Sequence, residues 1–288
     1  MTMHMLSFDV EEYFQTQAAA EGGVRVEDWA TYERRLPASI EKVLAILADQ
    51  DVTATFFVLG WVARHERAVV AQIAAAGHEI ASHGMTHRML GELTADEFRA
   101  ELRDSRKLLE DISGKPVVGF RAPTFSITRR TAWALDVLAE ELFRYDSSIF
   151  PIRHDRYGIP DAPRWIHRAI GPAGGEIVEI PPLTARAFGV NLPVGGGGYL
   201  RLLPTSLIRR AIRRAERAGQ PAMIYLHPWE LDPDQPVLPM TRTSRFRHRV
   251  NLSRTEPRLR DLLSRHHFST VAAALAHATC PTTHEYAA

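Results

Sequence analysis

The 288-residue sequence predicts an α/β fold, a distorted (β/α) barrel of about seven parallel strands. Short apolar runs rich in β-branched and aromatic residues alternate with longer amphipathic segments, which is typical of repeated βα units around a parallel sheet. Polar residues capable of chemistry directly follow several of the apolar runs, as they do at the carboxyl ends of barrel strands. These observations favour a closed or nearly closed barrel over an open doubly wound sheet.

The predicted strands are short apolar runs bounded by turn-forming or charged residues. In chain order they are residues 5–10, 52–59, 79–82, 117–120, 143–147, 177–180 and 223–226. The run at 52–59 is almost continuously apolar, as expected for a parallel strand that is covered on both faces. In the first run, side chains two residues apart point to the same side, so Asp9 and Glu11 are expected to share one side.

The predicted helices place apolar side chains at helical spacing. In chain order they are residues 37–50, 69–76, 94–112, 131–141, 206–218 and 256–263. The first has Ile40, Val43 and Leu47 on one face. The third opens with Thr94 and Glu97, which have the spacing of a capping box.

Composition points to an ordinary globular protein. Lys and Arg number 35 against 34 Asp and Glu, a net charge of +1, so the overall charge predicts neither a nucleic-acid partner nor a membrane-surface partner, and any charge effect is expected to be local. No apolar segment is long enough to be a transmembrane helix or an export signal, and the single Cys280 fits a reducing compartment. We therefore expect a cytoplasmic protein with a single domain over 1–288, in which residues 231–288 form a C-terminal extension packed on the barrel.

Two groups of residues suggest a metal site. His83 and His87 follow a predicted strand and are four residues apart, so that both imidazoles could reach one cation on a helical turn. Asp9, Glu11 and Glu12 cluster at the end of the first strand, where they could supply a base and a metal ligand. Taken singly, the histidines also fit a surface or capping role, and the acids fit the start of a helix.

Three further strand ends carry residues that could act in catalysis. His227 follows the last predicted strand and precedes a proline, Arg121 follows residues 117–120, and Asp146 lies in the strand at 143–147. Each has an ordinary structural explanation when it is considered alone. Their common position at strand ends indicates one assembled site, because barrel active sites draw residues from several strands.

The order of these motifs resembles the NodB-type polysaccharide deacetylases, carbohydrate esterase family 4. The motifs are Ser7-Phe8-Asp9, Ser82-His83 to His87, Arg121-Ala122-Pro123, Asp146 and Leu226-His227, which together run from about residue 5 to 230. Residues 8–14, 145–151, 193–203 and 228–263 look like the branch of the family found beside exosortase and exopolysaccharide biosynthesis genes.

The resemblance implies a role for each matching residue. It implies that Asp9 is the general base and that Arg121 orients it. It implies that His83 and His87 bind a divalent metal, with zinc as the expected ion. It implies that His227 is the general acid and that Asp146 steers His227.

One position departs from the family pattern. The family motif has two adjacent aspartates, of which the second is a metal ligand, whereas Val10 follows Asp9 in this chain. Glu11 is our candidate for the replacement ligand, and Glu12 is the alternative. If neither carboxylate reaches the histidines, the site would resemble the metal-independent amidohydrolases that share this fold.

The resulting functional prediction is a metal-dependent hydrolase that removes N-acetyl groups from amino sugars of a polysaccharide or lipid-linked glycan. The competing predictions are a metal-independent amidohydrolase acting on a small cyclic amide and a non-catalytic glycan-binding barrel. The basic cluster at 242–249 is interpreted as a solvated loop that could also hold an anionic glycan or the diphosphate of a lipid-linked sugar. The glycines at 195–198 are interpreted as a flexible loop near the cleft, because they lack the ending of a nucleotide-binding loop.

Overall fold

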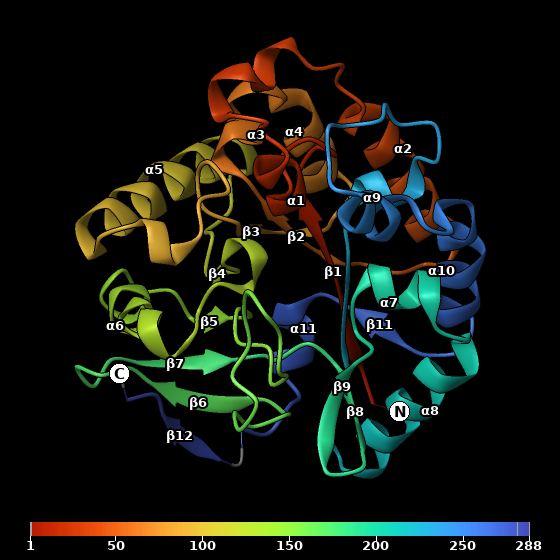
Figure 1. The fold of residues 1–288 in the computed structure, drawn as a ribbon. Helices are drawn as coiled ribbons and strands as arrows, with labels where there is room; N and C mark the ends of the chain where they lie inside the picture. The colour runs from red at the N-terminus through yellow and green to blue at the C-terminus, as the bar shows by residue number, and fades with distance from the viewer. Residues whose placement is uncertain (1, 281, 288) are drawn as a thin grey trace.

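The computed structural model describes residues 2–280 and 282–287. Within these residues, a ten-stranded sheet curves through the molecule with helices around it, and a two-stranded hairpin stands apart from it (Figure 1). The sheet has the strand order β10-β1-β2-β3-β4-β5-β7-β6-β12, and β11 pairs with β1. The strands are β1 His4–Val10, β2 Thr55–Val58, β3 Glu79–Ser82, β4 Gly119–Phe120, β5 Tyr145–Asp146, β6 His167–Ile170, β7 Glu176–Glu179, β8 Thr184–Ala187, β9 Val190–Pro193, β10 Met223–Leu226, β11 Phe268–Ser269 and β12 Thr283–Glu285.

The barrel prediction is confirmed by the seven neighbouring strands β10, β1, β2, β3, β4, β5 and β7, each of which is parallel to the next. They coincide with the seven runs predicted from the sequence. In the described part of the chain, no strand pairing joins β10 to β7, so the barrel is nearly closed rather than closed. The other strands of the large sheet are short additions, namely antiparallel β6 on β7, β12 on β6 and β11 on β1.

The strand register aligns the positions from which the polar residues emerge. Phe8 in β1 pairs with Leu226 in β10, so Asp9 and His227 follow at the same level of adjacent strands. All of β1 is buried, and it lies between its parallel neighbours β10 and β2.

The same alignment holds across the next strands. Ser82 in β3 pairs with Phe120 in β4, so His83 and Arg121 leave their strands side by side. Asp146 in β5 pairs with Phe120 and therefore lies at the level of Ser82 and Phe120 on the next strand. Segments far apart in the sequence are thereby brought to one edge of the sheet.

The helices pack around the sheet. The longer ones lie in the segments that the sequence predicts as helical. They are α1 Gln17–Glu21, α2 Leu36–Asp49, α3 Gly60–His65, α4 Arg67–Ala75, α5 Ala95–Ser113, α6 Trp133–Glu140, α7 Gly197–Leu202, α8 Thr205–Arg217, α9 Arg242–Arg249, α10 Thr255–Leu263 and α11 Val271–Leu275. The capping box is confirmed at the start of α5, where Thr94 and Glu97 exchange hydrogen bonds. The basic segment predicted as a loop is helix α9, which begins where the Thr241 side chain accepts a hydrogen bond from Ser244 N.

The C-terminal part of the chain contacts the sheet at two places. Phe268 in β11 pairs with His4 in β1, and His284 in β12 pairs with Ala169 in β6. Among the described residues, no helix combines the length and the apolar character needed to cross a bilayer.

Candidate active site and metal centre

Glu11, His83 and His87 form a buried group of possible metal ligands at the carboxyl end of the parallel strands. One ligand atom from each lies within 4.8 Å of the others. Glu11 Oε2 is 2.8 Å from His87 Nε2. His83 Nδ1 lies 2.8 Å from the carbonyl oxygen of Arg121 and donates to it, which leaves His83 Nε2 with its lone pair.

The charge states of this group suit a divalent cation. Burial lowers the pKa of His83 to about 4, so its imidazole is neutral near pH 7. Burial raises the pKa of Glu11, but the nearby histidines, His87 first and then His227 and His83, outweigh it and the pKa falls to about 2. Among the described residues, buried Glu11 Oε2 has no partner with hydrogen-bond geometry. A neutral imidazole beside a carboxylate oxygen that lacks a hydrogen bond is a donor set that fits zinc.

Glu12, the alternative ligand, lies elsewhere. Its Oε1 accepts hydrogen bonds of 2.9 Å from the backbone N–H groups of Arg35 and Leu36, at the first turn of α2. Burial raises the pKa of Glu12 to about 7. The structure therefore brings Glu11, and not Glu12, to the two histidines.

Asp9 is held by Arg121, a fully buried side chain. Arg121 Nη1 lies 2.6 Å from Asp9 Oδ1 and also donates to Ser7 Oγ at 2.8 Å. On its other side, Arg121 Nη2 donates to Ser147 Oγ at 2.9 Å, and the guanidinium carbon lies 4.1 Å from the centre of the Phe57 ring. These contacts fix both the position and the orientation of the Asp9 carboxylate.

His227 lies beside Glu11, with 3.7 Å between Nε2 and Glu11 Oε1, and is oriented by Glu230. His227 Nδ1 is 2.8 Å from Glu230 Oε1, and Glu230 Oε2 in turn accepts from Arg201 Nε at 2.8 Å. His227 Nε2 points toward Asp9, with 3.9 Å between Nε2 and Oδ2. Burial lowers the pKa of His227, but the hydrogen bond to Glu230 and the nearby carboxylates raise it to about 9. His227 is therefore protonated near pH 7.

Asp146 does not occupy the position that the family resemblance implied. Its Oδ1 accepts from Ser148 Oγ, and it pairs with Glu179 across β5 and β7. Burial raises the pKa of both Asp146 and Glu179. The carboxylate that contacts the His227 ring is Glu230, so the expectation that Asp146 steers His227 is corrected here.

Sequence reasoning missed Glu230 and Arg201. Glu230 stands three residues after His227, and this spacing lets it contact both the backbone N–H and the ring of His227 once Pro228 starts a short 3-10 turn. Arg201 comes from α7, and no local pattern links the two segments.

One open cavity of about 220 Å³ is lined by Asp9, Glu11, His83, His87 and His227. Trp229 stacks on His227 at 5.1 Å and on His248 at 4.2 Å between ring centres, and it donates from Nε1 to Glu11 Oε1 at 3.3 Å. From the basic cluster at 242–249, Arg247 and His248 line this cavity. The other arginines do not, since Arg245 and Arg249 donate to backbone carbonyls elsewhere.

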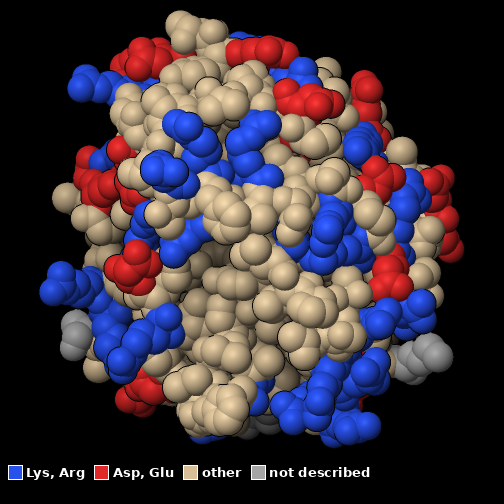
Figure 2. Space-filling model, turned by 45° about the vertical axis from the view of Figure 1, so that its right-hand side comes forward, with Lys and Arg blue, Asp and Glu red and all other residues tan. Residues whose placement is uncertain are grey.

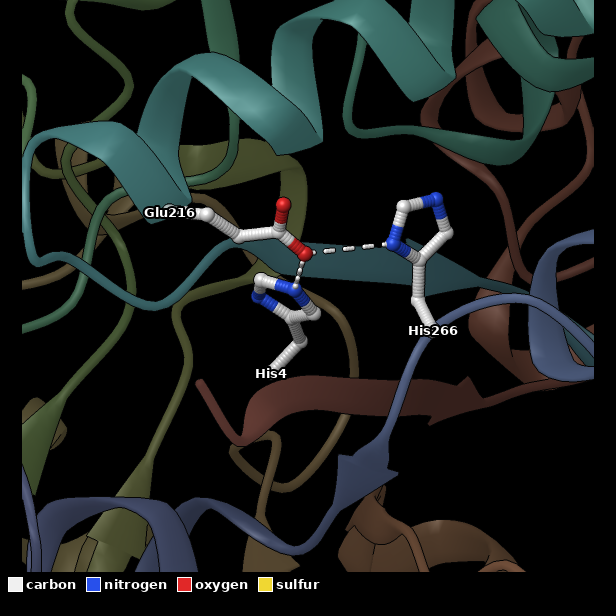
Figure 3. A group of neighbouring side chains, drawn as sticks. All are labelled: His4, Glu216 and His266. Carbon is white, nitrogen blue, oxygen red and sulfur yellow. Dashed lines mark hydrogen bonds and ion pairs between the residues drawn. The ribbon is translucent and has the colours of Figure 1, made fainter. Parts of the chain in front are cut away.

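A second group, His4, Glu216 and His266, also has its polar atoms close together (Figure 3). His4 Nδ1 accepts a hydrogen bond from Ala222 N at 3.1 Å, so the proton of the neutral ring is on Nε2. That nitrogen donates to Glu216 Oε1 at 3.1 Å and has no lone pair for a metal. We interpret the group as a hydrogen-bonded tie between β1, α8 and the segment before β11.

Comparison with known proteins divides the chain into two matched segments. Residues 28–139 match the family described as polysaccharide deacetylase, and residues 147–276 match a domain of unknown function, DUF3473. The first segment contains His83, His87 and Arg121. Asp9 and Glu11 precede it, and His227 lies in the second segment.

Two curated relatives are deacetylases. The chain is 32% identical to a chitooligosaccharide deacetylase of Rhizobium leguminosarum bv. trifolii over 37% of this chain and 46% of the relative. It is 27% identical to a peptidoglycan deacetylase of Helicobacter pylori over 49% of this chain and 52% of the relative. The chain thus spans about half the length of these relatives.

A crystal structure from Mycobacterium smegmatis, assigned to the polysaccharide deacetylases, has the same fold. The TM-score is 0.63 at 18% identity, with 96% of this chain and 91% of that chain covered. The likeness at this identity concerns the fold. The match to the polysaccharide deacetylase family itself covers residues 28–139, which is part of the chain.

Proposed function

We propose that this protein is a metal-dependent hydrolase that removes N-acetyl groups from amino sugars of a glycan. The observation that carries the proposal is the arrangement of five side chains around one cavity. Two imidazoles and a carboxylate, from His83, His87 and Glu11, lie on one side of it. A carboxylate held by arginine and a protonated imidazole, from Asp9 and His227, lie close by.

Asp9 is suited to accept a proton. Its Oδ1 is bound by Arg121, which leaves Oδ2 directed toward the cavity and toward His227 Nε2. A divalent ion held by Glu11, His83 and His87, with zinc as our expectation, would acidify a water molecule and stabilise negative charge on the acetyl oxygen. Asp9 would take the proton of the attacking water.

His227 is suited to donate a proton. Glu230 accepts a hydrogen bond from Nδ1–H, so Nε2–H faces the cavity, where the amide nitrogen of the substrate would lie. Protonation of this nitrogen is needed because an amine anion is a poor leaving group. In this scheme Glu230 is a positioning residue, and the products are acetate and a free amino sugar.

For the substrate, we propose a polysaccharide or lipid-linked glycan precursor in exopolysaccharide synthesis, handled in the cytoplasm. Support comes from the sequence resemblance to the exopolysaccharide-associated branch and from the glycans named for the two relatives. The cavity wall also contains Tyr157, Tyr225 and Trp229, aromatic side chains on which sugar rings can pack.

Acetate release from N-acetylglucosamine oligomers and from lipid-linked N-acetylated sugars tests this proposal. We expect release that stops after treatment with a chelator and returns on addition of zinc. Release of acetate at the same rate in chelator would point to the metal-independent alternative, for which hydrolysis of small cyclic amides is the positive assay. Tight glycan binding without any release would favour the non-catalytic alternative.

A further inference from the structure

Helix α8 presents a stripe of positive charge on its outer face. Arg210, Arg213, Arg214 and Arg217 recur at helical spacing, are exposed, and line one hollow of about 370 Å³. No ion pair joins any of these four to a carboxylate in residues 2–280 or 282–287. Like charges three and four residues apart destabilise a helix by roughly 0.2–0.5 kcal/mol per pair. The stripe is therefore a feature that a negatively charged partner would stabilise.

The single acidic residue of α8 does not neutralise the stripe. Glu216 Oε1 is bound by His4 Nε2 at 3.1 Å and by His266 Nδ1 at 3.3 Å (Figure 3). These contacts hold its carboxylate on the side of the helix that faces the sheet. The neighbouring Arg209, unlike the four arginines of the stripe, is paired with Asp261.

Beside α8, the β8–β9 hairpin exposes large apolar side chains. Its two-residue turn is Phe188-Gly189, with φ values of 49° and 77°, and the Phe188 side chain is 103% exposed. Val190 and Leu192 on β9 are 56% and 45% exposed. An aromatic side chain at the tip of a turn, with apolar neighbours behind it, is more than the scattered apolar exposure that most surfaces carry.

The apolar hairpin and the basic stripe belong to one surface. A groove of about 440 Å³ between them is lined by Ala185, Leu192 and Leu207 and also by Arg210 and Arg214. In Figure 1 the hairpin and α8 lie next to each other at the lower right, and Figure 2 shows Lys and Arg side chains gathered on the lower part of the molecule.

We propose that this surface, formed by the β8–β9 hairpin and the arginine stripe of α8, docks onto membranes that contain anionic lipids. Phe188 and Val190 would enter the interface of the bilayer, and the arginines would contact lipid phosphates. A nucleic acid or another soluble polyanion would account for the arginines but would leave the fully exposed Phe188 without a partner. The proposal does not depend on the catalytic activity, since none of these side chains contacts the candidate metal ligands.

Sedimentation with vesicles tests the proposal on the full chain. We expect binding to vesicles of phosphatidylcholine and phosphatidylglycerol in equal parts, weaker binding at high salt, and little binding to phosphatidylcholine alone. The double variant Arg210→Gln/Arg214→Gln should lower the partition coefficient about 30-fold, and Phe188→Ser should lower it about tenfold or more.

Matched controls change similar residues elsewhere. Leu142→Asn removes another exposed apolar side chain, and Arg64→Gln/Arg130→Gln removes two exposed arginines that lie outside this surface. Both controls should bind vesicles like the unchanged protein. The proposal is overturned if the unchanged protein ignores anionic vesicles, or if the controls lose as much binding as the α8 and hairpin variants. Two results together would also overturn it: Phe188→Ser binds vesicles like the unchanged protein, and the unchanged protein binds soluble polyphosphate as tightly as it binds anionic vesicles.

Discussion

At the scale of single residues, His227 and the metal-ligand group have separable contacts. His227 Nδ1 is bound by Glu230, and its Nε2 lies 3.7 Å from Glu11 Oε1, whereas the other oxygen of Glu11, Oε2, is the one that lies 2.8 Å from His87 Nε2. We therefore expect His227→Ala to retain its metal and to lower kcat by about 10²–10⁴, the range for loss of one general acid. Metal analysis and acetate-release rates on the same preparation check this. Loss of the metal together with activity would show that the two groups are not separable.

Glu230 should act on the pH profile through His227. Burial alone would lower the pKa of His227, and the hydrogen bond to Glu230 is the largest influence that raises it. Without that negative charge, His227 would lose its proton at lower pH, so Glu230→Gln should shift the alkaline limb of the kcat/KM profile toward lower pH. If Glu230→Gln reduced the activity but left the alkaline limb unchanged, Glu230 would contribute to the fold without setting the pKa of His227.

The residues of the site differ in how far the sequence could predict them. Asp9 lies near the end of β1, and Glu11, His83 and Arg121 directly follow β1, β3 and β4, so the register brings them together. His87 lies five residues beyond β3, and its place depends on the turn that follows this strand. Glu230 was missed because the partner of His227 depends on the path of the short turn after β10, which Pro228 and Trp229 set. Asp146 was assigned to His227 from the resemblance, but its place in β5 directs it to Glu179.

At the scale of elements, the glycines at the start of α7, Gly196 at its N-cap and Gly197 in its first turn, let that helix approach the site closely. A Cβ on Gly197 would lie 2.1 Å from Glu230 Oε1, and one on Gly196 would lie 2.5 Å from Tyr225 Oη. Gly196 also forms a bridge to Tyr225 in β10. The segment interpreted from sequence as a flexible loop is therefore packed against the last strand and against Glu230.

This packing predicts different effects for two adjacent glycines. Gly197→Ala should displace Glu230, lower kcat and shift the alkaline limb in the same direction as Glu230→Gln. Gly198→Ala is the matched control, because its Cβ would have only Arg201 Nη2 nearby, at 3.9 Å. Steady-state kinetics over a range of pH compare the two. Equal activity in both variants would contradict the role given to this close approach.

The elements themselves were predictable where periodicity was strong. The seven parallel strands and helices such as α5 have long or continuous apolar patterns, and the capping box marks the start of α5. The hairpin β8–β9 was missed because Arg186, Asn191 and Pro193 interrupt the pattern of its sequence, and its outer side chains are exposed. Helix α9 was missed because its composition is mostly polar, so that only the Thr241 cap indicates a helix.

At the scale of the whole molecule, buried histidines make stability depend on pH. Burial lowers the pKa of His78 and of His167 to about 4, from an ordinary value of 6.5. Between these values the unfolded chain binds protons that the folded chain does not, so the free energy of unfolding falls as the pH drops from 6.5 toward 4. Each such histidine contributes a slope of up to about 1.4 kcal/mol per pH unit.

Urea unfolding at several pH values measures this slope. His167 lies far from the cavity, with Nδ1 bonded to Trp165 O and Nε2 to the Tyr286 hydroxyl. His167→Gln should therefore reduce the slope by up to about 1.4 kcal/mol per pH unit, whatever its effect on stability at pH 7. A slope unchanged by this substitution would show that His167 is not neutral in the folded protein at acidic pH.

The site also joins parts of the chain that family matching separates. His83, His87 and Arg121 lie in the polysaccharide deacetylase match, whereas His227, Glu230 and Arg201 lie in the segment of unknown function. Because β10 pairs directly with β1, this second segment supplies a strand of the barrel itself. We infer that residues 147–276 complete the proposed active site and are not a separate binding module.

The central claim is that Glu11, His83 and His87 hold one divalent ion. Metal analysis of the purified chain after dialysis against zinc-containing buffer and then metal-free buffer tests it most directly, with Glu11→Gln and Glu12→Gln measured alongside. The account predicts one zinc ion per chain in the unchanged protein and in Glu12→Gln, and a large loss in Glu11→Gln. An unchanged protein without bound metal, or equal metal content in all three, would contradict it.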